Sequence, residues 1–148
     1  LKKAEKYSCK VILPTDLIIA EELSKNTPTS VVSADECPDN CMILDAGPLT
    51  VDNIKQCIDS TKTLLWNGPL GAFEVSPFDQ ATNQAAKFAS EKTKNGDLIS
   101  VAGGGDTVAA LNKAGVTESF TYVSTAGGAF LEWLEGKELP GVACLTNN

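Results

Sequence analysis

The sequence contains no arginine and no histidine, so all 12 of its cationic side chains are lysines. Enzymes that act on anionic substrates usually bind them with arginine, because its guanidinium donates two parallel hydrogen bonds to one carboxylate or phosphate. An anion-binding site in this chain would therefore use backbone N–H groups, or its cationic part lies outside the chain. The formal net charge of −7 argues against nucleic acid as a partner.

Long apolar runs are missing as well. No run approaches the ~20 residues that a membrane-spanning helix needs, so we expect no membrane partner. The five cysteines are scattered, and Cys37 and Cys41 have neither a second pair nor a histidine to complete a metal site. We therefore expect reduced cysteines in one cytoplasmic domain. Because the chain begins at Leu1 inside a helix-like segment and without an initiator methionine, we expect it to be part of a longer protein.

Short apolar runs alternate with segments of helical periodicity along most of the chain. Thr50 is the expected cap of one helix, with its apolar stripe at Val51, Ile54 and Ile58. Ser76 and Pro77 predict the start of another helix, which ends at residues 95–96. Shorter helices are expected at residues 108–114 and 129–135, an extended tail at 139–143, and strands at 10–14, 16–20, 31–34, 41–45, 63–66, 98–102 and 120–123. This alternation predicts a Rossmann-like α/β fold of three αβα layers, in which helices cover both faces of a mainly parallel sheet.

Three glycine-rich turns follow three of the expected strands. They are Asn-Gly-Pro-Leu-Gly at residues 67–71, Gly-Gly-Gly-Asp-Thr at 103–107 and Ser-Thr-Ala-Gly-Gly at 124–128. In a parallel sheet such turns meet at the carboxyl edge, where open α/β folds bind ligands. Glycine lets backbone N–H groups approach a phosphate, and a helix N-terminus adds partial positive charge. These turns predict a cradle for a polyphosphate, and Asp106 suits a cation that accompanies the phosphates.

Neither of the two common nucleotide-binding motifs is present. The sequence has no Gly-x-x-x-x-Gly-Lys-Ser/Thr, and its triple glycine does not continue as Gly-x-Gly-x-x-Gly. A nicotinamide dehydrogenase would carry the second motif after its first strand, whereas the triple glycine follows a late strand here. The pattern therefore disfavours a dehydrogenase.

Five segments, taken in order, carry a resemblance to a known family. They are residues 13–16 (Leu-Pro-Thr-Asp), 45–48 (Asp-Ala-Gly-Pro), 66–74 (Trp-Asn-Gly-Pro-Leu-Gly-Ala-Phe-Glu), 103–107, and 124–142, which begins Ser-Thr-Ala-Gly-Gly-Ala-Phe-Leu-Glu-Trp. Together they resemble the latter part of the nucleotide-binding C-terminal domain of phosphoglycerate kinase, in a bacterial-like form. The resemblance implies a glycolytic phosphotransferase with a carboxyl group as acceptor. Its reaction would be reversible, magnesium-dependent phosphoryl transfer between 1,3-bisphosphoglycerate and ADP, giving 3-phosphoglycerate and ATP.

The resemblance also implies a role for individual residues of the three turns. Glu74 would accept hydrogen bonds from the ribose hydroxyls, Asp106 would hold Mg²⁺, and the catalytic candidates, which face the transferred phosphoryl group, are Gly127 and Gly128. The remaining nucleotide-binding candidates are Asn67 and Pro69, near the sugar and phosphates, and Gly103, Gly104, Gly105 and Thr107, at the phosphates.

Other conspicuous residues have simpler interpretations. We expect Asp45 to be a turn and capping residue, and Trp66 and Trp133 to be core residues that do not stack on adenine. Ala126 stands where many relatives have the first glycine of a triple, and a positive φ at this position would strain an alanine.

Enzymes of the family have two domains. The resemblance implies that residues 1–148 are part of the C-terminal domain, and that the N-terminal domain, which binds 3-phosphoglycerate, and the first strands of the C-terminal domain are absent. Strand 63–66 would then have an open edge. We therefore expect this chain to belong to a larger polypeptide, with a monomeric parent enzyme, or to self-associate through that edge; a stable monodisperse monomer in size-exclusion chromatography would contradict both.

Because half of the reacting assembly is missing, the isolated chain is expected to be inactive. Two alternatives stay open: a non-catalytic module that binds Mg-nucleotide, and a structural fragment without a ligand.

Overall fold

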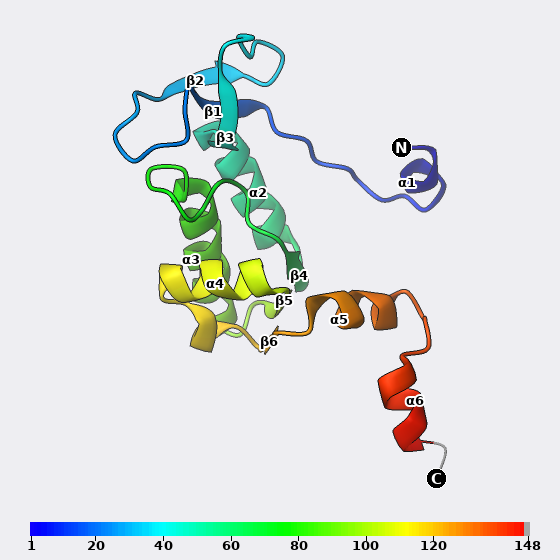
Figure 1. Cartoon of the computed structure of the whole chain (residues 1–148). Helices are drawn as coiled ribbons and strands as arrows, with labels where there is room; N and C mark the ends of the chain where they lie inside the picture. The colour runs from blue at the N-terminus through cyan, green and yellow to red at the C-terminus, as the bar shows by residue number, and fades with distance from the viewer. Residues whose placement is uncertain (147–148) are drawn as a thin grey trace.

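The computed structural model describes residues 1–146 (Figure 1). Helices and strands alternate along most of this length. In chain order the elements are α1 (Lys2–Lys6), β1 (Asp16–Ala20), β2 (Ser30–Ser33), β3 (Met42–Ala46), α2 (Pro48–Ser60), β4 (Thr63–Asn67), α3 (Gln80–Lys94), β5 (Ile99–Gly103), α4 (Gly105–Ala114), a 3₁₀ turn η1 (Thr117–Ser119), β6 (Tyr122–Ser124), α5 (Gly127–Leu134) and α6 (Pro140–Thr146).

The strands form two sheets of three strands each. In one sheet β4, β5 and β6 are parallel, and β5 lies in the centre. In the other, β1 pairs antiparallel with β2 on one side and with β3 on the other. The α/β fold with a parallel sheet flanked by helices confirms the predicted class. The antiparallel sheet was not predicted, because a short apolar run does not encode the direction of its neighbour.

One face of the parallel sheet carries the main core. Residues of α2, α3 and α4 pack there with β4 and β5 in one apolar cluster, to which α3 contributes Ala85, Ala86 and Ala89, all fully buried. The opposite face is covered at its carboxyl end by α5, whose Phe130 ring lies against Gly103. Farther along this face, Ile99 is 55% exposed. The main core therefore lies on the face that α2, α3 and α4 cover, and it extends from the amino ends of the strands (Leu98, Phe120) to their carboxyl ends (Trp66, Ala102).

Two extended segments predicted from the sequence are absent. Residues 10–14 form no strand, and Val11, Ile12 and Leu13 are exposed; in Figure 1 this segment connects α1 to β1 as irregular coil. A strand is stable only when a neighbour pairs with it, and no strand of residues 1–146 pairs with this segment. The tail expected to be extended begins α6 at Pro140 instead, because proline suits the first turn of a helix.

Four helix starts also differ from the prediction: α4 and α5 begin earlier than expected, at Gly105 and Gly127, and α2 and α3 begin at other residues than their predicted caps indicate. α2 begins at Pro48 with Gly47 as its N-cap, because the Thr50 hydroxyl donates to the Asp16 carboxylate (2.7 Å) and does not cap the helix. α3 begins at Gln80, after a series of turns that includes Ser76 and Pro77. The start of α2 differs because of a contact with a residue that is distant in sequence. The start of α3 differs because the turns before it end a few residues later than the local pattern indicates.

The outer side of β4 is open, as expected: within residues 1–146, β5 is the strand that pairs with β4. A hollow of about 360 Å³ lies along β4 and is lined by Ile12, Ile54, Leu65 and Leu70, among others. Self-association through this edge stays a prediction. Across the described residues, no helix combines the length and apolar character needed to cross a bilayer.

Candidate functional site

The three glycine-rich turns lie together at the carboxyl ends of β4, β5 and β6. The Gly68 N–H donates to the Thr107 hydroxyl at 2.7 Å, which joins the first turn to the second. The Gly104 N–H donates to the Ser124 carbonyl at 3.2 Å, which joins the second turn to the third. This geometry agrees with the convergence predicted from the parallel strands, while the binding role of each residue stays a prediction.

Two glycines allow the second and third turns to approach each other. Gly104 has φ = +104°, a conformation that L side chains rarely adopt. A Cβ atom on Gly127 would lie 2.5 Å from the Gly104 nitrogen and would also overlap its Cα. Ala126, by contrast, has φ = −93°, so alanine fits there without strain. The N-termini of α4 and α5 can therefore meet only because residue 127 has no side chain.

These two helix N-termini present donors that no side chain uses. Within the described residues, neither α4 nor α5 has a side-chain cap, although the first N–H groups of a helix need acceptors. In the first turn of α4, Gly105 and Asp106 are exposed. Thr107 is buried, and its hydroxyl accepts a hydrogen bond from the Gly68 N–H. This contact does not involve the backbone N–H of Thr107. The arrangement suits an anion with several oxygens.

Hydrogen bonds from Trp66 and to Thr82 hold the first turn in place. The Trp66 indole donates to the Gly68 carbonyl at 2.6 Å, and the Leu70 N–H donates to the Thr82 hydroxyl of α3 at 3.0 Å. The Asn67 side-chain oxygen lies close to Gly104: a Cβ atom built on Gly104 would be 3.4 Å from it. One hydrogen-bonded segment, which borders the Gly104 turn, therefore carries Asn67, Pro69 and Glu74.

The two tryptophans differ in burial. Trp66 is 8% exposed and packs edge-on against Phe120, as expected of a core residue. Trp133 is 61% exposed and stacks on Phe130, with ring centroids 6.5 Å apart. The expectation that Trp133 is a core residue is wrong, because α5 contacts the sheet through Phe130 and leaves Trp133 on its outer side.

Sequence reasoning missed Lys113, in the last turn of α4. Its ammonium lies 2.6 Å from the Phe73 carbonyl oxygen, 3.4 Å from that of Glu74 and 3.0 Å from Oδ2 of Asp79. A lysine in the last turn of a helix usually indicates a solvated cation at the negative end of the helix dipole. Its position in the chain therefore gave no signal of these contacts, which span about 40 residues.

Asp45 caps α3 from the end of β3. It is 2% exposed, and its carboxylate accepts hydrogen bonds from the Ala46 and Ala81 N–H groups, both at 2.9 Å. This confirms the expected capping role, whereas the expectation of a turn residue is wrong, since Asp45 lies in strand β3. Burial raises the pKa of Asp45 to about 6, against these two hydrogen bonds, and the nearby charge of Asp79 also raises it. Asp79 is buried too, but its hydrogen bond and ion pair with Lys113 hold its pKa below the ordinary value.

The raised pKa of Asp45 predicts a loss of stability as the pH rises. Its pKa in the folded chain is above the ordinary value of 3.8, so the folded state binds the proton more tightly than the unfolded state, and the gain disappears as the pH rises past about 6. Between pH 5 and pH 7.5 this group should lower the free energy of unfolding by about 1.4 kcal/mol. Urea unfolding of the wild type and of Asp45→Asn across this range measures the change, because asparagine does not titrate.

The other shifted carboxyls do not interfere with that measurement. The pKa values of Asp16 and Asp79 are lowered from 3.8, so both groups stay ionised throughout the range. A difference between wild type and Asp45→Asn that does not vary with pH would contradict the prediction.

No protein-only metal centre is present in residues 1–146, since no three Asp, Glu, Cys or His side chains gather in a suitable group. Asp106 offers one exposed carboxylate beside the uncapped start of α4. Mg²⁺ is commonly bound by one or two carboxylates together with substrate phosphates and water. The donor set therefore fits a cation that arrives with a phosphate ligand.

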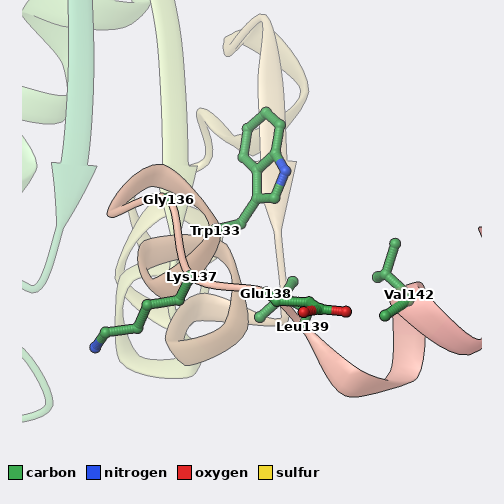
Figure 2. A pocket seen from close by; sticks show the side chains of 7 residues that line it. Trp133, Gly136, Lys137, Glu138, Leu139 and Val142 are labelled. Carbon is green, nitrogen blue, oxygen red and sulfur yellow. The ribbon is translucent and has the colours of Figure 1, made fainter.

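Another hollow lies between α5 and α6. It has a volume of about 350 Å³, and Figure 2 shows Trp133, Leu139 and Val142 around it while Lys137 points away. Lys137 is paired with Glu135 at 2.7 Å. None of the predicted site residues lines this hollow. By contrast, Asn67 and Gly68 line the hollow along β4.

Comparison with known proteins adds independent information. The model of the family described as Phosphoglycerate kinase matches residues 1–137. The phosphoglycerate kinase of Methylobacterium radiotolerans is 62% identical over 145 residues, which cover 98% of this chain and 36% of that protein. That of Dinoroseobacter shibae is 58% identical over 145 residues, with 98% and 37% covered. The solved structure of phosphoglycerate kinase from Coxiella burnetii superposes with a TM-score of 0.87 at 42% identity, covering 96% of this chain and 36% of that one.

Proposed function

The chain belongs to the phosphoglycerate kinase family, and from that membership we propose that it is the nucleotide-binding part of a phosphotransferase. The proposed reaction is reversible phosphoryl transfer between 1,3-bisphosphoglycerate and ADP, giving 3-phosphoglycerate and ATP, in the glycolysis of the cytoplasm. The chain spans 36–37% of the length of the curated relatives it matches. The complete activity is therefore proposed for a protein that also contains the remaining part.

One observation carries the proposal: the uncapped N-termini of α4 and α5 meet where Gly104 lies against Gly127. The two N-termini are therefore close together, and both helix dipoles add positive charge there. In this proposal the backbone of residues 103–107 binds the nucleotide phosphates. Gly127 and Gly128 donate to the phosphoryl group during transfer, in which positioning and charge stabilisation supply most of the catalysis.

Asp106 would hold Mg²⁺, which would neutralise part of the phosphate charge when bound. The exposed carboxylate in the first turn of α4 supports this assignment. Glu74 would accept hydrogen bonds from the ribose hydroxyls, and Asn67 and Pro69 would lie against the nucleotide. The support for these three is their common segment, whose backbone is hydrogen-bonded to α3 and α4.

We further propose that the isolated chain binds nucleotide without turning it over. It contains no arginine or histidine, so it lacks the bidentate donors with which an acidic sugar phosphate is usually bound. 3-Phosphoglycerate would bind to the other domain of the complete enzyme.

Titration calorimetry with Mg-ADP up to millimolar concentration tests the binding. The wild-type chain should bind weakly, and the double variant Glu74→Ala, Asp106→Ala should remove the signal, because it deletes both carboxylates that are proposed to contact sugar and cation. Glu118→Ala is a matched control, since Glu118 is exposed in η1, beyond the opposite end of α4. Absence of binding by the wild type would favour a structural fragment without a ligand.

A coupled assay separates binding from catalysis. The 148-residue chain, supplied with 1,3-bisphosphoglycerate and Mg-ADP, should form no ATP above the uncatalysed rate. ATP formation by the purified chain would overturn the proposal that it is inactive.

A further inference from the structure

Lys113 connects two parts of the site that are far apart in the sequence. It lies in the last turn of α4, and the first turn of the same helix carries Asp106. Its ammonium donates to the carbonyl oxygens of Phe73 (2.6 Å) and Glu74 (3.4 Å). A helix of this length, about 15 Å, therefore joins the phosphate end of the site to the backbone of Glu74.

The contact is stronger than a surface ion pair. Lys113 also pairs with Asp79 at 3.0 Å, and the Asp79 side chain is only 8% exposed. Hydrogen bonds from a charged donor are about twice as strong as neutral ones. A buried carboxylate that lost its cation would be left beside the carboxyl group of Asp45, whose pKa already reflects the charge of Asp79. The lysine is thus held firmly from the Asp79 side while it donates to the 73–74 carbonyls.

The segment that carries Glu74 lies between two buried side chains. Phe73 is 7% exposed and Phe78 is fully buried, whereas Glu74 itself is exposed. The flanking phenylalanines fix the ends of the segment. The direction of the Glu74 backbone within it depends on where the carbonyl oxygens of residues 73 and 74 point, and both lie within reach of Lys113.

We propose that Lys113 is a positioning residue for Glu74: with Asp79 as its counter-charge, it sets the place of the Glu74 carboxylate relative to the first turn of α4. This inference rests on the proposed function, in which Glu74 accepts the sugar hydroxyls of a nucleotide. Lys113 does not touch the ligand and acts through the backbone of Glu74.

The test compares two nucleotides, Mg-ADP and Mg-2′,3′-dideoxy-ADP, which lacks the hydroxyls that Glu74 would accept. The wild-type chain should prefer ADP by about tenfold, since hydrogen bonds to a charged group are strong. In Lys113→Met this preference should fall to within about twofold of unity, as in Glu74→Ala, because the carboxylate is no longer aimed at the sugar. Lys113→Arg should retain most of it, because it keeps a charged donor.

Controls separate positioning from stability. Lys94→Met removes a matched exposed lysine from the last turn of α3 and should leave the preference unchanged. Lys113→Gln, which keeps a donor without the charge, serves if the methionine variant does not fold, and it too should lower the preference. If Lys113 only stabilised the fold, its loss would weaken both nucleotides equally and leave their ratio intact.

Each remaining outcome decides one of the two proposals. If a folded Lys113→Met or Lys113→Gln variant keeps the tenfold preference for Mg-ADP, this inference is overturned and the proposed function stands. A wild type that binds both nucleotides equally removes the assigned role of Glu74 and this inference with it. A wild type that binds neither overturns the proposed function as well.

Discussion

Gly127→Ala should reduce the affinity for Mg-ADP at least tenfold and destabilise the chain. The new methyl group would lie 2.5 Å from the Gly104 nitrogen, and backbone atoms cannot rotate out of its way as a side chain can. Overpacking of this kind costs about 1–3 kcal/mol even where side chains give way. Relief requires α5 to move away from the Gly104 turn, which would separate the two sets of N–H groups proposed to share one phosphate chain.

The neighbouring glycine supplies the control. A Cβ on Gly128 would meet no heavy atom within 4 Å, so Gly128→Ala should change the free energy of unfolding by no more than about 0.5 kcal/mol. Urea unfolding of both variants measures the contrast, and calorimetric titration measures the affinity of Gly127→Ala. Equal stability of the two variants would mean that α5 does not lie against Gly104 in solution.

Asp16→Ala should destabilise the chain by about 3 kcal/mol. The Asp16 carboxylate is 4% exposed and accepts the Leu49 N–H (3.0 Å), the Thr50 N–H (2.7 Å) and the Thr50 hydroxyl (2.7 Å). Alanine would leave these donors at the start of α2 without their acceptor. Burial raises the pKa of Asp16, but these hydrogen bonds outweigh it and the net pKa is lowered, so the stabilisation is present at neutral pH and is lost as acid protonates the carboxylate.

Urea unfolding at pH 7 measures this effect. Asp52→Ala is the matched control: Asp52 lies in α2, its side chain is 65% exposed, and it makes a 3.7 Å ion pair with Lys55. Exposed pairs of this kind contribute little, so that change should stay within about 0.5 kcal/mol. A loss of similar size in both variants would contradict the role of Asp16 as the buried acceptor that starts α2.

The sequence predicted those parts of the site that follow from local pattern and from the geometry of parallel strands. Glycines after β4, β5 and β6 had to meet at one edge, because the carboxyl ends of parallel strands lie together. The start of α2 was predicted wrongly, since Thr50 reads locally as a cap but is bonded to a residue 34 positions earlier. Lys113 was missed for the same reason: its partners are about 40 positions away. Periodicity reports which face of an element is apolar, and it contains no information about a polar contact between distant segments.

The order of the parallel sheet has a consequence for how the site opens. Within residues 1–146, β5 pairs on both sides, whereas β4 and β6 each pair on one side. Amide protons of β5 should therefore exchange with solvent last among the three strands, because their release requires the whole sheet to separate. The triple-glycine turn continues directly from β5, so the donors proposed for the phosphates follow the strand that is expected to open last, whereas the segment that carries Glu74 follows β4, an edge strand of this sheet.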